Sequence, residues 1–140
     1  MKRIILIAIL SAFALTVWAQ TISFGLGDPT LEASLNEIGA SAKLDLPGFT
    51  AEVSLQWGVP QVQIQAALGQ SLQPAEVYLA ASLASLSGKP LATVVDSYKK
   101  NKAKGWGALA KDLGIKPGSK EFKALKDKST ASAVKSKKKK

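Results

Sequence analysis

The residues of this chain most able to do chemistry are lysines, which gather in two short runs. One run comprises Lys99, Lys100, Lys102 and Lys104, and the other closes the sequence as Lys137, Lys138, Lys139 and Lys140. A lysine ammonium group is a strongly hydrated point charge, so it suits diffuse attraction to anions better than bidentate recognition of a base or a phosphate. Both runs are therefore candidate anion-binding sites. Lipid phosphates, lipopolysaccharide, teichoic acids and extracellular nucleic acid are the candidate ligands.

Composition excludes several other kinds of chemistry. The chain contains no His and no Cys, which rules out Ser-His-Asp and Cys-His catalysis and thiolate metal sites. Asp96 and Asp112 could be drawn as an acid and a base, but no spacing rule singles them out. The sequence also lacks a dense Asp/Asn loop of the calcium-binding kind. We therefore expect no enzyme activity, no cofactor and no metal site.

Trp106 has the most unusual neighbours of any aromatic residue, because it stands between Gly105 and Gly107. Two glycines would let a ligand approach the indole ring, so Trp106 could be an exposed stacking platform. More often such a residue fills the core, and its glycine neighbours allow an unusual backbone turn. We favour the core interpretation.

The first nineteen residues have the layout of a secretory signal peptide. Met1-Lys2-Arg3 is basic, residues 4–17 are largely apolar, and Val17 and Ala19 occupy positions −3 and −1 of a cleavage site before Gln20. The apolar run is shorter than the roughly 20 residues that a transmembrane helix needs. We expect cleavage after Ala19, export to the periplasm or the exterior, and no transmembrane segment in the mature chain.

Charge is unevenly divided along the remaining sequence. Residues 20–88 contain one lysine and six carboxylates, whereas residues 89–140 contain sixteen lysines and four carboxylates. A basic half of this kind attracts polyanions, and each lysine near an anionic membrane contributes up to about 1 kcal/mol. The alternative is a solvated surface that aids solubility.

Residues 30–57 alternate between apolar and polar positions in three runs. The apolar sets are Leu31, Ala33 and Leu35, then Ile38, Ala40, Ala42, Leu44 and Leu46, then Phe49, Ala51, Val53, Leu55 and Trp57. A period of two is typical of half-buried strands, and Pro47-Gly48 is a turn-like break. The pattern predicts a three-stranded antiparallel β-meander. A helix over 28–39 is the competing interpretation, with Asp28 as its N-cap and Pro29 at its first position.

From Gly58 onward the sequence contains residues that typically begin and end helices. Prolines begin three predicted helices, at Pro60, Pro74 and Pro90. The third carries Leu91, Val94, Val95 and Tyr98 at the spacing of one helix face. A short helix then runs to Leu113, with Gly114 as a left-handed cap, and Ser119 N-caps a last helix through Phe122 and Leu125. The predicted fold class is α+β: a single domain over 20–128, with a β-meander at about 30–57 and a bundle of four to five short helices at about 60–128.

Residues 129–140 lack apolar periodicity, and we expect them to form a flexible, lysine-rich tail. Removing this segment should then leave the stability of the domain nearly unchanged.

The segment 102–122 contains the most distinctive series of residues: Gly-Trp-Gly, Ala-Lys, Leu-Gly-Ile-Lys-Pro-Gly-Ser and Glu-Phe. In this series the chain resembles the C-terminal module of a group of uncharacterised exported bacterial proteins. The resemblance extends more weakly upstream and covers most of the mature chain. It implies export but no established activity, so no catalytic residue follows from it.

The same segment resembles the first helix and turn of a helix-turn-helix unit over 108–115. Residues 119–128 would then be a recognition helix, with Lys120, Lys123, Lys126 and Lys128 facing phosphates. The signal peptide and the absence of Arg after Arg3 disfavour this. We therefore expect an exported, non-catalytic envelope protein that binds an anionic envelope component or a protein partner. A DNA-binding protein with an uncleaved N-terminus is the alternative.

Overall fold

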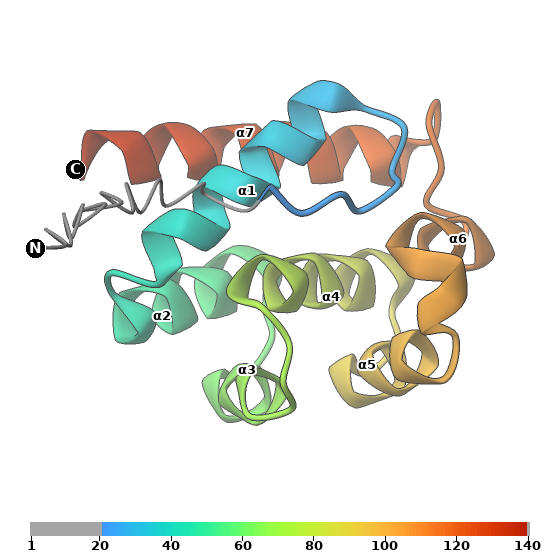
Figure 1. Cartoon of the computed structure of the whole chain (residues 1–140), viewed down its shortest axis with the longest axis horizontal. Coiled ribbons are helices and arrows are strands. Elements are labelled where there is room, and N and C mark those ends of the chain that lie inside the picture. Colours follow the sequence, from blue (N-terminus) through green and yellow to red (C-terminus); the bar gives the residue numbers. More distant parts are fainter. Residues whose placement is uncertain (1–20, 140) are drawn as a thin grey trace, which may run out of the picture.

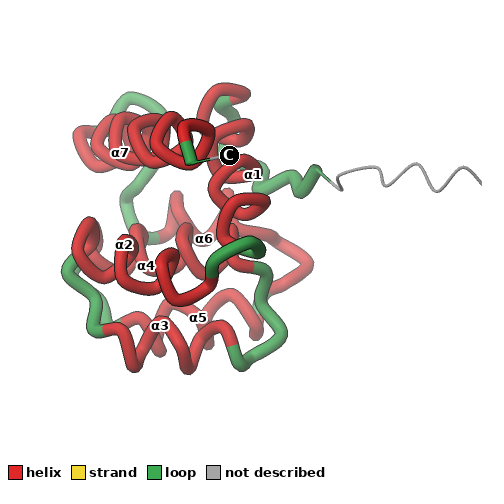
Figure 2. Tube along the Cα trace, turned by 90° about the vertical axis from the view of Figure 1, so that its left-hand side faces the viewer, coloured by secondary structure: helices red, strands yellow, loops and turns green. Residues whose placement is uncertain are grey.

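The computed structural model describes residues 21–139, which form an all-helical fold (Figure 1). The elements are α1 (Pro29–Ala42), α2 (Leu46–Trp57), α3 (Gln61–Leu68), α4 (Pro74–Ser87), α5 (Leu91–Lys100), the 3-10 helix η1 (Lys102–Lys104), α6 (Gly105–Asp112) and α7 (Lys120–Lys138). No strand occurs anywhere in residues 21–139 (Figure 2). The predicted β-meander over 30–57, and with it the α+β class, is therefore wrong.

The strand prediction failed because two periods coincide in this segment. Residues four apart share a face both in a strand and in a helix, so the pairs Leu31/Leu35 and Phe49/Val53 fit either structure. The residues between them decide the matter. Ala33 and Ala40 are exposed, and Leu55 is 87% exposed although the strand pattern placed it inside.

Capping residues begin the two N-terminal helices. The Asp28 carboxylate accepts a hydrogen bond from the Leu31 N–H at 2.9 Å, and the Asp45 carboxylate accepts one from the Gly48 N–H at 3.0 Å. Pro29 and Pro47 each lie in the first turn that follows, where a missing N–H costs nothing. The competing helix that begins at Asp28 is thus confirmed, and Pro47-Gly48 opens α2 instead of turning between strands.

Helix α4 is the centre of the fold. Its sequence is apolar on all sides, and every residue from Val77 to Ala84 is buried, as is Ala75. Helices α1 and α7 lie on one side of α4, and α3 and α5 lie on the other (Figure 1). The predicted starts at Pro60, Pro74 and Pro90 are confirmed, because Pro60 and Pro90 are the N-caps of α3 and α5 and Pro74 begins α4.

Helix α7 extends much further than the sequence pattern suggested. Ser119 caps it as predicted, accepting a hydrogen bond from the Phe122 N–H at 3.0 Å. The helix then continues to Lys138, and its buried face comprises Phe122, Leu125, Ser129, Ala133 and Ser136. Residues 129–138 are therefore helical and partly buried, which corrects the expectation of a flexible tail. Small side chains on this face let α7 lie close along α1 (Figure 2).

Candidate functional site

Trp106 belongs to the core and joins three helices. Its side chain is 3% exposed, and its ring stacks on Tyr98 with centroids 3.9 Å apart. The indole Nε1–H donates a hydrogen bond to Glu76 Oε2 at 2.9 Å, while Oε1 of the same carboxylate accepts one from the Gln73 N–H at the start of α4. Burial, together with the Glu76 carboxylate, raises the pKa of the Tyr98 hydroxyl. The indole ring is thus no exposed stacking platform.

The two glycines beside Trp106 have separate structural roles. Gly105 has φ 76° and ψ 179°, a conformation open essentially to glycine alone. The Gly107 N–H donates a hydrogen bond to the Phe24 carbonyl at 2.9 Å. A Cβ atom on Gly107 would lie 2.0 Å from the Gly25 carbonyl oxygen, so only glycine lets residues 22–26 pack here. The Gly-Trp-Gly series is therefore explained by packing.

We expect Gly107→Ala to lower the free energy of unfolding by about 1–3 kcal/mol, the usual cost of overpacking. The added methyl group must push residues 22–26 away from α6, because its nearest neighbour is backbone. Denaturant unfolding gives the loss, and faster amide hydrogen exchange at Phe24 and Leu26 would locate it. Gly69→Ala is the matched control, since Gly69 has φ −73° and the nearest atom to a new Cβ is 3.4 Å away. Equal effects of the two substitutions would contradict the packing argument.

The two lysine runs lie at opposite ends of the molecule (Figure 1). Lys99 and Lys100 form the end of α5, and Lys102 and Lys104 belong to η1; we call these four the η1 lysines. Lys137 and Lys138 end α7 and Lys139 follows as its cap, whereas Lys140 lies outside the described residues. The structure therefore does not join the two predicted runs into one site.

The described lysines of both runs are exposed, and few of them have a charged partner. Lys99 donates a hydrogen bond to Gln70 Oε1 at 2.8 Å. Lys139 forms an ion pair with Glu52, and this hydrogen bond raises the pKa of the Lys139 ammonium. Among residues 21–139, the other described lysines of the two runs form no ion pair. Their charges remain available to an external anion.

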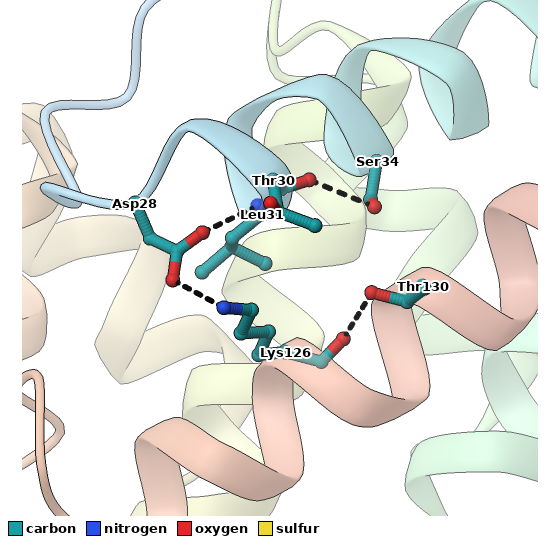
Figure 3. Close-up of polar contacts among 6 residues, drawn as sticks. All are labelled: Asp28, Thr30, Leu31, Ser34, Lys126 and Thr130. Carbon is teal, nitrogen blue, oxygen red and sulfur yellow. Dashed lines mark hydrogen bonds and ion pairs between the residues drawn. The ribbon is translucent and has the colours of Figure 1, made fainter.

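The first half of α7 is occupied by contacts within the protein. Lys126 Nζ lies 2.9 Å from Asp28 Oδ2, so the residue that caps α1 also pairs with α7 (Figure 3). Two hydroxyls bond to the backbone beside this pair: Ser34 Oγ to Thr30 on α1, and Thr130 Oγ1 to Lys126 on α7. The Lys126 hydrogen bond holds the pKa of Asp28 below its usual value. The pair therefore stabilises the fold above the ordinary carboxyl range, and this contribution is lost as the pH falls through the lowered pKa.

The lysines that a helix-turn-helix interpretation would place on phosphates are partly engaged elsewhere. Besides the Lys126 pair, Lys123 forms an ion pair with Asp127 at 3.0 Å, and Lys128 Nζ lies 4.6 Å from the centre of the Trp57 ring. Helix α7 packs along α1 and against α4. Its buried face is thus used to close the helical domain.

A polar cluster that the sequence reasoning missed connects α2, α4 and α7. The Tyr78 hydroxyl donates a hydrogen bond to Gln56 Oε1 at 2.7 Å, and the Ser132 hydroxyl donates to the same oxygen at 3.0 Å. Trp57 meets the Tyr78 ring edge-on, and burial raises the pKa of the Tyr78 hydroxyl. The adjoining cavity has a volume of about 50 Å³, far below that of a typical ligand pocket. The spacing of Ser129, Ser132 and Ser136 was the available sequence signal.

The cluster links α7 to α2 and α4 through these side-chain hydrogen bonds. Two of its polar atoms, Trp57 Nε1 and Ser129 Oγ, are buried without a hydrogen-bond partner among the described residues. In residues 21–139, no three acidic side chains gather as they would around a metal ion. No helix in that range has both the length and the apolar character to cross a membrane.

Comparisons of this chain with protein-family models, with curated proteins and with solved structures give no match. The resemblance of the Gly-Trp-Gly module to exported bacterial proteins therefore stays a prediction.

Proposed function

We propose that this chain is an exported, non-catalytic protein that binds an anionic component of the cell envelope through exposed lysines. The observation that supports it most is the state of these lysines, since most of those described lack an ion pair within residues 21–139. A lysine without an internal ion pair can contact an external phosphate or carboxylate without first breaking that pair. Several acting together produce an attraction that one lysine cannot.

The predicted cleavage after Ala19 is compatible with the contacts made by residues 22–26. The Asn36 side chain accepts a hydrogen bond from the Ile22 N–H at 2.8 Å and donates one to the Ile22 carbonyl at 2.9 Å. The Glu32 carboxylate then accepts hydrogen bonds from the N–H groups of Phe24 and Leu26. Cleavage after Ala19 would leave all of these contacts in place.

The test is binding of the mature chain to anionic vesicles, lipopolysaccharide and random duplex DNA as the salt concentration rises. The starting residue of that chain is first established by the intact mass of the exported product. Affinity should fall steeply with salt, because lysine–anion contacts release condensed counterions. Replacing Lys137, Lys138, Lys139 and Lys140 by Gln should weaken binding. On DNA it should flatten the slope of log K against log salt by about one unit per lost contact.

The matched variant replaces the four η1 lysines by Gln, which removes the same number of charges at the other end. Circular dichroism should be the same for both variants and the parent, since the side chains that the structure describes among these lysines are exposed. An absence of binding at low salt to all three anions would indicate that the lysines only aid solubility. Tight, sequence-selective DNA binding at physiological salt would instead favour the DNA-binding alternative.

A further inference from the structure

The corner between α1 and α2, residues 43–47, exposes two large apolar side chains. Leu44 is 77% exposed and Leu46 is 44% exposed. The backbone here is fixed by hydrogen bonds, because the Leu44 N–H donates to the Ser41 carbonyl at 3.1 Å and the Asp45 carboxylate caps α2. Lys43 and Pro47 beside them are exposed as well. The corner thus presents leucines to the outside from an ordered backbone.

The C-terminal end of α7 lies at the same end of the molecule as this corner (Figure 1). Asp45 of the corner and Lys139 line the same small cavity, and Lys139 pairs with Glu52 of α2. The last turns of α7, which end here, carry four exposed lysines: Lys135, Lys137, Lys138 and Lys139. With Lys43 they outnumber the nearby carboxylates, which are Glu37, Asp45 and Glu52. Apolar side chains and excess positive charge therefore occur together here.

We infer that this end of the molecule docks on an anionic lipid bilayer. Leu44 and Leu46 would enter the boundary between headgroups and acyl chains, and the lysines of α7 would face lipid phosphates. The inference rests on the proposed function and names its ligand as lipid.

A bilayer explains the leucines, whereas a soluble polyanion does not. DNA or teichoic acid in water would attract the lysines but would offer no apolar phase to Leu44 and Leu46. Binding of a protein to a membrane surface strengthens with the apolar area that it inserts and with its attraction to anionic lipids. The elements that carry the η1 lysines, α5 and η1, expose no large apolar side chain, because those of residues 21–139 belong to other segments: Leu44, Leu46, Leu55, Val62 and Val134.

The natural absence of Cys allows the insertion to be located directly. Leu44→Cys in the mature chain is labelled with an environment-sensitive dye and mixed with vesicles of phosphatidylglycerol and phosphatidylcholine, or of phosphatidylcholine alone. We expect a blue shift and brighter emission only with the anionic vesicles. Val62→Cys is the matched control, since Val62 is 75% exposed on α3, on the opposite side of the molecule from α7 (Figure 2). Its label should change little.

A double substitution, Leu44→Ser with Leu46→Ser, tests the affinity. It should weaken binding to the anionic vesicles about tenfold, because it removes apolar surface that the bilayer would bury. Binding to random duplex DNA should not change, because every lysine remains. Val62→Ser should leave both affinities as they are.

The outcomes separate the inference from the proposed function. Equal vesicle binding by the double variant and the parent, or equal dye responses at positions 44 and 62, would overturn bilayer docking. Salt-dependent binding to vesicles and DNA would then still support the proposed function. Failure to bind any anion at low salt would overturn both.

Discussion

Removing residues 129–140 is expected to lower the free energy of unfolding by about 3–5 kcal/mol, the scale of deleting a large core side chain. The deletion takes away the buried face of Ser129, Ala133 and Ser136. It also uncovers Tyr78, which is 2% exposed in the complete domain, and removes Ser132 from the polar cluster. The denaturant midpoint of the shortened chain should therefore fall well below that of the parent.

A shorter deletion distinguishes the contribution of the α7 buried face to stability from that of its terminal charges. Removing only Lys139 and Lys140 eliminates the ion pair with Glu52 but leaves the buried face of α7 intact. Exposed ion pairs contribute at most about 1 kcal/mol, so the midpoint should hardly move. If the long deletion were as harmless as the short one, the flexible tail would have been the right interpretation after all.

The sequence could predict where helices begin and end wherever a backbone rule operates. Proline fixes φ, glycine tolerates positive φ and a serine hydroxyl caps an N–H, so Pro74, Gly114 and Ser119 each specified a boundary. These rules depend on neighbouring residues alone. They hold at Asp28 and Asp45 as well, where the two-residue alternation was given more weight than the caps.

Choosing between helix and strand over 30–57 needed knowledge of the partner surface. Leu31, Leu35 and Ile38 are buried because α7 and α4 pack on α1, and no local rule says that these helices exist. The prediction for the last turns of α7 was wrong for the same reason. Serine and alanine carry little apolar signal, yet Ser129 and Ala133 are buried because a small side chain is what close packing on α1 requires.

The candidate site was only partly predictable for a related reason. The lysine runs are visible in composition, and their exposure follows from their charge. The leucines of the α1–α2 corner were assigned to the buried face of a strand. Only the three-dimensional arrangement shows that Leu44 and Leu46 are exposed, and that the α1–α2 corner lies at the end of the molecule where α7 finishes.

Replacing Trp106 by Ala is expected to lower the free energy of unfolding by about 3–5 kcal/mol, as other large aromatic deletions in cores do. Three contacts are lost at once: the filled volume, the stacking on Tyr98 and the hydrogen bond to Glu76. Truncation also leaves one oxygen of the Glu76 carboxylate without its indole donor. Chemical denaturation followed by circular dichroism measures the loss.

Trp106→Phe distinguishes the ring from its N–H group. Phenylalanine can still stack on Tyr98 and fill much of the volume, so most of the destabilisation should be recovered, and the remainder reflects the lost hydrogen bond to Glu76 and the smaller ring. Iodide quenching gives an independent measure, because a ring that is 3% exposed should be protected. A Trp57→Phe background leaves Trp106 as the emitting indole of the mature chain. Two results together would contradict the core position of Trp106: full quenching of its fluorescence, and an alanine variant as stable as the parent. They would indicate an exposed ring that could serve as a stacking platform.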